Sequence, residues 1–188
     1  MSRRHLVVVA AIVAGLGLPE ASASEPATVD PQVQVTAERD VYHVTARFSV
    51  TQPAATAMAV LTDYERIPRF MPAVTSSTVL ERGAGHAVVA QEATARMLMF
   101  SKRVHLVLDI DEDGATIRFR DRCGTSFESY AGAWTVSPTD GLVEIVYVLD
   151  ASPAFEVPEF LLKRLLRRDA MRMIEQLRAE IAARAGDR

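Results

Sequence analysis

Three aromatic side chains with polar tips, Tyr130, Trp134 and Tyr147, fall in segments where apolar and polar residues alternate. Such alternation predicts strands with one buried face. Tyr130 and Trp134 are four positions apart, so they share a face of one strand, together with Glu128. Inward-facing rings either fill a plain core or line a cavity, where a hydroxyl or indole N–H can hold the polar end of a ligand. The sequence leaves both interpretations open.

Other residues that commonly carry chemistry are scattered. The four histidines, His5, His43, His86 and His105, lie in separate segments without metal-ligand spacing. Cys123 is the only cysteine and has no base nearby in the sequence, so we expect a buried, small apolar side chain. Nucleophile-elbow, phosphate-loop and dinucleotide motifs are missing. We therefore predict no catalytic constellation, no metal site and no cofactor.

Charge excludes one class of partner and suggests another. The formal net charge of −3 argues against a nucleic-acid partner. Within this acidic chain, "LLKRLLRRDAMR" gathers Lys163, Arg164, Arg167 and Arg168 on the polar side of a predicted helix. A basic helix face is either simply solvated or makes a transient contact with anionic lipid headgroups. The sequence carries no signal of oligomeric state.

The N-terminus has the layout of a secretory leader. Residues 1–23 combine Arg3 and Arg4, an apolar run and an Ala21-Ser22-Ala23 site. The apolar run is shorter than the ~20 residues that span a bilayer. We therefore expect a signal peptide at 1–23, a linker at 24–32, one domain at 33–184 and a periplasmic location.

The elements follow one after another with little between them. Alternation and turn residues predict a strand pair over 33–50 and further strands near 74–82, 86–95, 97–110, 115–121, 126–137 and 142–151. Short turns between successive strands imply an antiparallel sheet. An apolar stripe with helical spacing predicts a long helix from about 156 to 183. Since only this helix is large enough to cover the sheet, we expect an interior space between them.

The stretch "VLTDYERIPRFMPAV" starts as an amphipathic helix and then presents Phe70 and Met71 between Pro68 and Pro72. We expect Pro68 to end a short helical turn, because the residue before a proline avoids helical geometry. Phe70 and Met71 then either plug the core or form a rim over the mouth of the interior space.

These features together resemble the START-like (SRPBCC) superfamily, which has the helix-grip fold. The resemblance rests on "VLTDYERIPRFMPAV", on "GAW" at 132–134, on "VEIVYVLDASPAFEVPEFLLKRLL" and on the final helix, and it covers nearly all of 33–184. The chain is most similar to the branch of polyketide cyclase/dehydrase-type and coenzyme Q-binding proteins. The resemblance implies an α+β fold in which a curved antiparallel sheet of about six to seven strands wraps the C-terminal helix, with two short helices after the first strand.

The resemblance also implies a hydrophobic ligand between sheet and helix, such as a lipid, an isoprenoid quinone or a polyketide-like molecule. We predict an exported binder or carrier. The alternative is a polyketide cyclase/dehydrase-like enzyme that uses Tyr130, Glu128 and Arg103 as acid and base groups. The side chains predicted to contact the ligand are Phe70, Met71, Phe100, Phe119, Glu128, Tyr130, Trp134, Tyr147, Leu162 and Leu166.

Overall fold

A computed structural model describes residues 30–96 and 101–186 of the chain. Its elements, in chain order, are β1 (Gln32–Glu38), β2 (Val41–Val50), α1 (Ala54–Leu61), the 3-10 helix η1 (Tyr64–Arg66), α2 (Ile67–Phe70), β3 (Val74–Gly83), β4 (His86–Arg96), β5 (Ser101–Asp113), β6 (Thr116–Asp121), β7 (Phe127–Thr139), β8 (Leu142–Pro153) and α3 (Glu159–Gly186). The predicted leader at 1–23 lies outside the described residues. No helix within the described ranges is long and apolar enough to cross a membrane.

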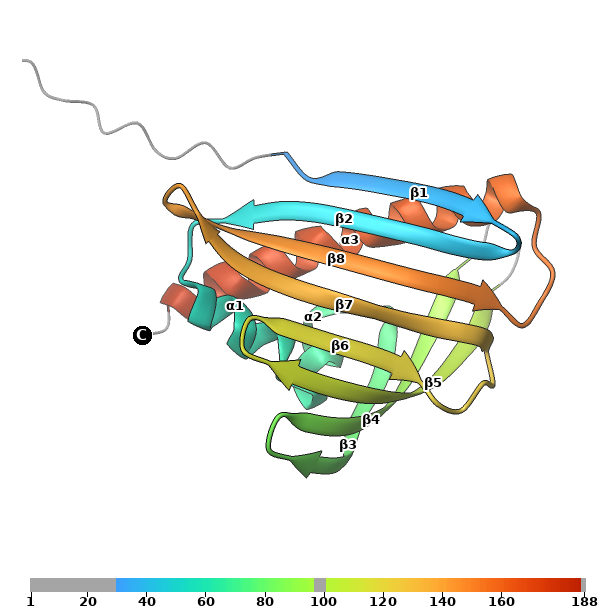
Figure 1. The fold of residues 1–188 in the computed structure, drawn as a ribbon, viewed down its shortest axis with the longest axis horizontal. Helices are drawn as coiled ribbons and strands as arrows, with labels where there is room; N and C mark the ends of the chain where they lie inside the picture. Colours follow the sequence, from blue (N-terminus) through green and yellow to red (C-terminus); the bar gives the residue numbers. More distant parts are fainter. Residues whose placement is uncertain (1–29, 97–100, 187–188) are drawn as a thin grey trace, which may run out of the picture.

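All strands join one antiparallel sheet in the order β1-β2-β8-β7-β6-β5-β4-β3. The sheet curves around α3, which crosses its inner side (Figure 1). The predicted α+β helix-grip fold is therefore confirmed. The resemblance implied about six to seven strands, and this number was too low, because the sheet has eight. The short helices follow the second strand, since residues 32–50 form a complete hairpin before the chain turns helical.

The core lies between the strands and α3. On β2 the predicted alternation holds, and Val44, Ala46 and Phe48 are buried on the inner face. From α3, Ile174 and Leu177 meet this face, and both are almost fully buried. Helix α3 begins at Glu159, later than predicted. The residue before a proline avoids helical geometry, so the helix does not extend past Pro158 toward the N-terminus.

Pro68 acts differently from the prediction. It does not end a helical turn but stands in the first turn of α2. A proline fits there because the amide N–H that it lacks would have no partner within the helix. α2 ends at Phe70, and Met71 leaves helical geometry before β3 begins. The chain between α1 and β3 is thus a compact cap at one end of the sheet (Figure 1).

Gly132 on β7 makes room for an aromatic ring. It pairs with Phe119 on β6 and with Leu149 on β8. A Cβ atom at Gly132 would lie 2.6 Å from Cζ of Phe119 and 2.2 Å from the carbonyl oxygen of Val148. The missing side chain therefore lets the Phe119 ring lie across β7, which explains the glycine of "GAW".

We expect Gly132→Ala to destabilise the fold, because the added methyl overlaps both the ring and a backbone oxygen that cannot move alone. The cost should reach about 1–3 kcal/mol, the usual range for overpacking a core. Urea denaturation of the purified protein measures it. Gly83→Ala is the matched control, since its Cβ would meet only a carbonyl oxygen 4.0 Å away. Equal stability of both variants would contradict this account.

Candidate functional site: an apolar cavity under the cap

A cavity of about 180 Å³ lies inside the grip, and we call it the main cavity. Its walls come from α1, the cap, the inner face of the sheet and α3. The lining residues are Val60, Leu61, Tyr64, Ile67, Phe70, Met71, Val74, Gln91, Leu108, Ile110, Ile117, Phe119, Tyr130, Trp134, Tyr147, Met173 and Leu177. None of these side chains carries a charge at neutral pH, because the only titratable ones are tyrosines. The cavity therefore favours an uncharged, mostly apolar guest.

Most of the predicted ligand-contacting residues meet at this cavity. The structure places six of them in its walls, namely Phe70, Met71, Phe119, Tyr130, Trp134 and Tyr147. Leu162 and Leu166 lie elsewhere along α3, in a second space of about 80 Å³ that we call the side cavity. Phe100 lies outside the described residues.

Glu128 does not belong to the cavity, so its predicted place beside Tyr130 was wrong. It is exposed, and the pairing of β7 with β8 shifts register between Phe127 and Ser129. A bulge of this kind adds one residue to a strand and breaks the strict alternation of faces. The two-residue spacing between Glu128 and Tyr130 therefore no longer puts them on the same side.

The aromatic residues form one cluster. The ring centroids of Trp134 and Tyr147 are 4.4 Å apart, those of Phe119 and Tyr130 are 5.8 Å apart, and Phe119 stacks on Tyr147 at 6.1 Å. Rings at these distances attract one another and hold each other in place. The polar tips in the cavity wall are thus carried by a rigid layer.

Two phenol groups supply most of the polarity of the cavity. Burial raises the pKa of Tyr130 and raises that of Tyr147 well above its ordinary value, and the hydroxyl of Tyr130 adds to the rise at Tyr147. Both phenols therefore keep their protons at physiological pH. They can donate hydrogen bonds to an oxygen of a ligand but cannot serve as anionic bases there.

Tyr64 and Gln91 are polar wall residues that the sequence did not single out. Tyr64 belongs to the cap, and its hydroxyl donates a 2.8 Å hydrogen bond to Oε1 of Glu112. Burial, with that bond second, raises the pKa of Tyr64. Gln91 donates to the hydroxyl of Ser77. Gln91 shares a face of β4 with Val89, and that alternation could have placed it inside.

Polar contacts hold the first half of the cap, residues 62–66, from two sides. Arg184 of α3 lies 2.9 Å from Oδ2 of Asp63 and donates to the carbonyl oxygen of Ala59. On the other side Arg82 donates to the carbonyl oxygen of Thr62 and pairs with Glu112, which also holds the Tyr64 hydroxyl. This half of the cap is fastened to both the helix and the sheet.

The second half of the cap, residues 67–71, rests on apolar contacts and on the guanidinium of Arg184, which lies 6.0 Å from the centre of the Phe70 ring. Ile67, Phe70 and Met71 are half-buried and pack against the core. Each of these three side chains lines the cavity and also reaches solvent, so together they stand between the cavity and solvent. If the cavity opens, this half of the cap offers less resistance than the fastened half.

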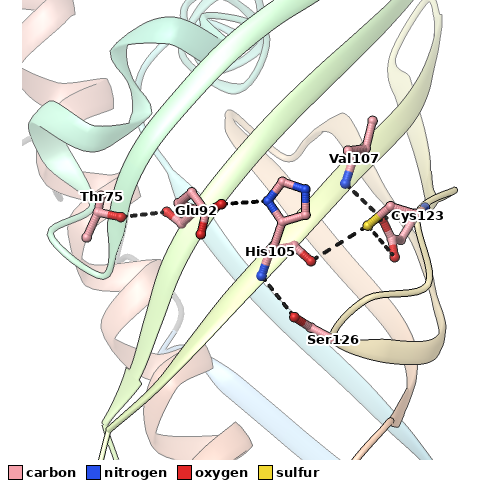
Figure 2. Close-up of polar contacts among 7 residues, drawn as sticks. Thr75, Glu92, His105, Val107, Cys123 and Ser126 are labelled. Carbon is pink, nitrogen blue, oxygen red and sulfur yellow. Dashed lines mark hydrogen bonds and ion pairs between the residues drawn. The ribbon is translucent and has the colours of Figure 1, made fainter.

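His105 and Cys123 lie on the outer face of the sheet, away from the cavity. Nδ1 of His105 is 2.6 Å from a carboxylate oxygen of Glu92, and the sulfur of Cys123 is 3.2 Å from Oδ1 of Asp121 (Figure 2). Cys123 is only half-buried, so the prediction of a buried apolar side chain was wrong.

The other two histidines of the described residues also pair with carboxylates across strands, His43 with Asp150 and His86 with Asp111. Across residues 30–96 and 101–186, no group of three or more His, Cys, Asp or Glu side chains could hold a metal ion.

The predicted basic residues lie on the first half of α3. Arg164 and Arg167 are exposed, whereas Lys163 pairs with Glu159 at 2.5 Å and Arg168 pairs with Asp169 at 2.8 Å. Phe160, on the same part of the helix, is 76% exposed. Exposed cations thus stand beside an exposed ring.

Solved structures with this fold include lipid-transfer proteins and aromatase/cyclases. The chain is similar to a STAR-related lipid transfer protein of Xanthomonas axonopodis (17% identity, TM-score 0.67, covering 83% of this chain and 98% of the other). It is similar to the Zhui aromatase/cyclase of Streptomyces sp. R1128 (18% identity, TM-score 0.66, covering 77% of this chain and 96% of the other). It is also similar to human STARD10 (13% identity, TM-score 0.61, covering 80% of this chain and 73% of the other).

No curated protein matches the sequence. A family match extends over residues 50–178, from the end of β2 to the last third of α3, and so includes the cap and every strand of the cavity wall. The chain therefore belongs to the family described as polyketide cyclase/dehydrase and lipid transport.

Proposed function

We propose that this protein is an exported binder or carrier of a hydrophobic small molecule, held in the main cavity. The observation that carries the proposal is an apolar cavity whose wall has aromatic rings and protonated phenols but no charged side chain. Such a wall suits an apolar ligand with an oxygen that accepts a hydrogen bond, as in a quinone, a polyketide-like ring or a lipid ester. The fold shared with lipid-transfer proteins supports this choice.

The size of the cavity limits which ligand it can hold without a change in its walls. Drug-sized ligands occupy pockets of about 300–1,000 Å³, whereas a cavity of about 150 Å³ takes a benzene molecule. At about 180 Å³ the main cavity accepts one small ring or the end of a longer molecule. Larger members of the proposed ligand classes need the cap or the wall to move.

Trp134 gives a direct test, because it is the only tryptophan of the chain and lines the cavity. We expect naphthoquinone and other small apolar carbonyl compounds to change its fluorescence with saturation at micromolar concentration. Mass spectrometry of an organic extract of the gently purified protein should detect an apolar molecule. A Tyr147→Phe variant should bind carbonyl compounds about five- to tenfold more weakly, as for one lost hydrogen bond, and bind naphthalene unchanged.

Absence of any bound molecule and of any fluorescence change would contradict the proposal. The second candidate, a cyclase or dehydrase, has support from the aromatase/cyclase fold. The predicted acid and base roles of Glu128 and Arg103 have less support, because both side chains are exposed and lie outside the cavity wall. Turnover of a polyketide-like substrate that vanishes in Tyr130→Phe would favour the enzyme.

We also expect the apolar half of the cap to control exchange of the ligand. Phe70→Ala should raise the dissociation rate at least about tenfold, equivalent to about 1.4 kcal/mol. The free energy of unfolding should change by less, because Phe70 is only half-buried. Stopped-flow release of a bound dye and urea denaturation measure the two quantities. Phe160→Ala is the matched control, and a larger loss of stability than of ligand retention would make Phe70 plain core.

Export and membrane contact belong to the same proposal. The sequence of residues 1–23 supports export to the periplasm, where a carrier would take up or deliver its ligand at a membrane. The exposed Arg164, Arg167 and Phe160 support a transient contact of α3 with anionic lipid.

We expect the double variant Arg164→Glu, Arg167→Glu to bind vesicles containing phosphatidylglycerol at least about 30-fold more weakly, because each basic residue near such a surface contributes about 1 kcal/mol. Vesicle co-sedimentation at low salt measures this. Arg118→Glu with Arg120→Glu is the control, since both lie exposed on the outer face of β6. Equal binding by the two double variants would exclude α3 as the contact.

A further inference from the structure

The main cavity and the side cavity lie in line along α3. The last α3 residue that lines the side cavity is Asp169, and the first that lines the main cavity is Met173. These residues are one helical turn apart, a rise of about 6 Å. Between them only Ala170 is buried, and its side chain is a single methyl group.

The strands show the same separation. On β5, Val104 lines the side cavity and Leu108 lines the main cavity. One inward-facing residue, Leu106, stands between them, so the two spaces are about 13 Å apart at most along this strand. The barrier between the cavities is therefore a single layer of side chains.

Two aromatic rings form the centre of this layer. Phe127 lines the side cavity, Tyr130 lines the main cavity, and their ring centroids are 4.9 Å apart. The bulge in β7 brings them so close, because Phe127 and Tyr130 are three positions apart and would otherwise face opposite sides. We call the two rings the partition.

The side cavity is apolar apart from one edge. Its wall includes Leu162, Leu165, Leu166 and Ala151, with Asp169 at the edge and paired with Arg168. Such a space is too narrow for a ring system but accepts a few methylene groups. Joined through the partition, the two cavities would form one elongated space near the lower limit of ordinary ligand pockets, about 300 Å³.

We propose that the side cavity is a second subsite, for the distal end of a linear acyl or isoprenoid chain, and that the Phe127–Tyr130 partition sets the chain length which the protein accepts. This inference rests on the proposed binding of a hydrophobic ligand in the main cavity. It adds that the partition makes the protein select compact or short-chain ligands over long ones.

The test is a chain-length series. Methyl esters of saturated fatty acids with eight to eighteen acyl carbons, which carry no charge, are titrated into the full mature chain, with Trp134 fluorescence as the signal. In the natural protein we expect affinity to rise with length and then level off once the main cavity is full. In Phe127→Ala the rise should continue, by about fourfold for each further methylene admitted, so that the longest chains bind at least about tenfold more tightly.

Two variants make the result specific. Leu80→Ala removes an exposed apolar side chain that lines neither cavity and should keep the natural profile. Ala151→Leu, added to Phe127→Ala, fills the side cavity and should abolish the gain for long chains. Phe127→Leu serves in place of Phe127→Ala if circular dichroism shows that the latter is unfolded.

The possible outcomes distinguish a failure of this inference from a failure of the proposed function. If methyl octanoate and naphthoquinone bind but Phe127→Ala and Phe127→Leu leave the length profile unchanged, the partition does not select length and the inference fails alone. A gain that survives Ala151→Leu also overturns it, because the chain would then lie elsewhere. If no compound binds the natural protein, both the function and the inference fail.

Discussion

A single helix has to cover the inner face of eight strands. Strands about 4.8 Å apart make a sheet more than 30 Å wide, whereas a helix with its side chains is about 10 Å across. The sheet reduces this mismatch by curving around α3 (Figure 1). The remaining volume is filled by large rings projecting from β6, β7 and β8 and by the cap. The main and side cavities are what this filling leaves empty.

The same constraint explains why the polar groups of the cavity are phenols. A charged side chain under the helix would lose its water without gaining a partner, which is costly. Tyr130 and Tyr147 bring hydroxyls into this space on rings that also contribute apolar surface. Their raised pKa values keep them as hydrogen-bond donors. The interior therefore offers hydrogen-bond donors without carrying a charge.

The cap joins the stability of the fold to access to its interior. Asp63 and Tyr64 are held by Arg184 and Glu112, so the start of the cap cannot leave without breaking contacts with both α3 and β5. Phe70 and Met71 pack among apolar neighbours, and the guanidinium of Arg184 lies 6.0 Å from the centre of the Phe70 ring. The second half of the cap is therefore held by less directional contacts than the first half.

The sequence by itself determined the fold and most of the cavity wall, because alternation on β2, β6, β8 and the part of β7 beyond its bulge decides which side chains face inward. It placed Phe119, Trp134 and Tyr147 correctly for this reason. Only the tertiary structure decided the rest. The bulge in β7 turned Glu128 outward and set Phe127 against Tyr130, and bulges leave no mark in the pattern of residues. The division into two cavities along α3 depends on side chains from separate strands, whose distances no single segment contains.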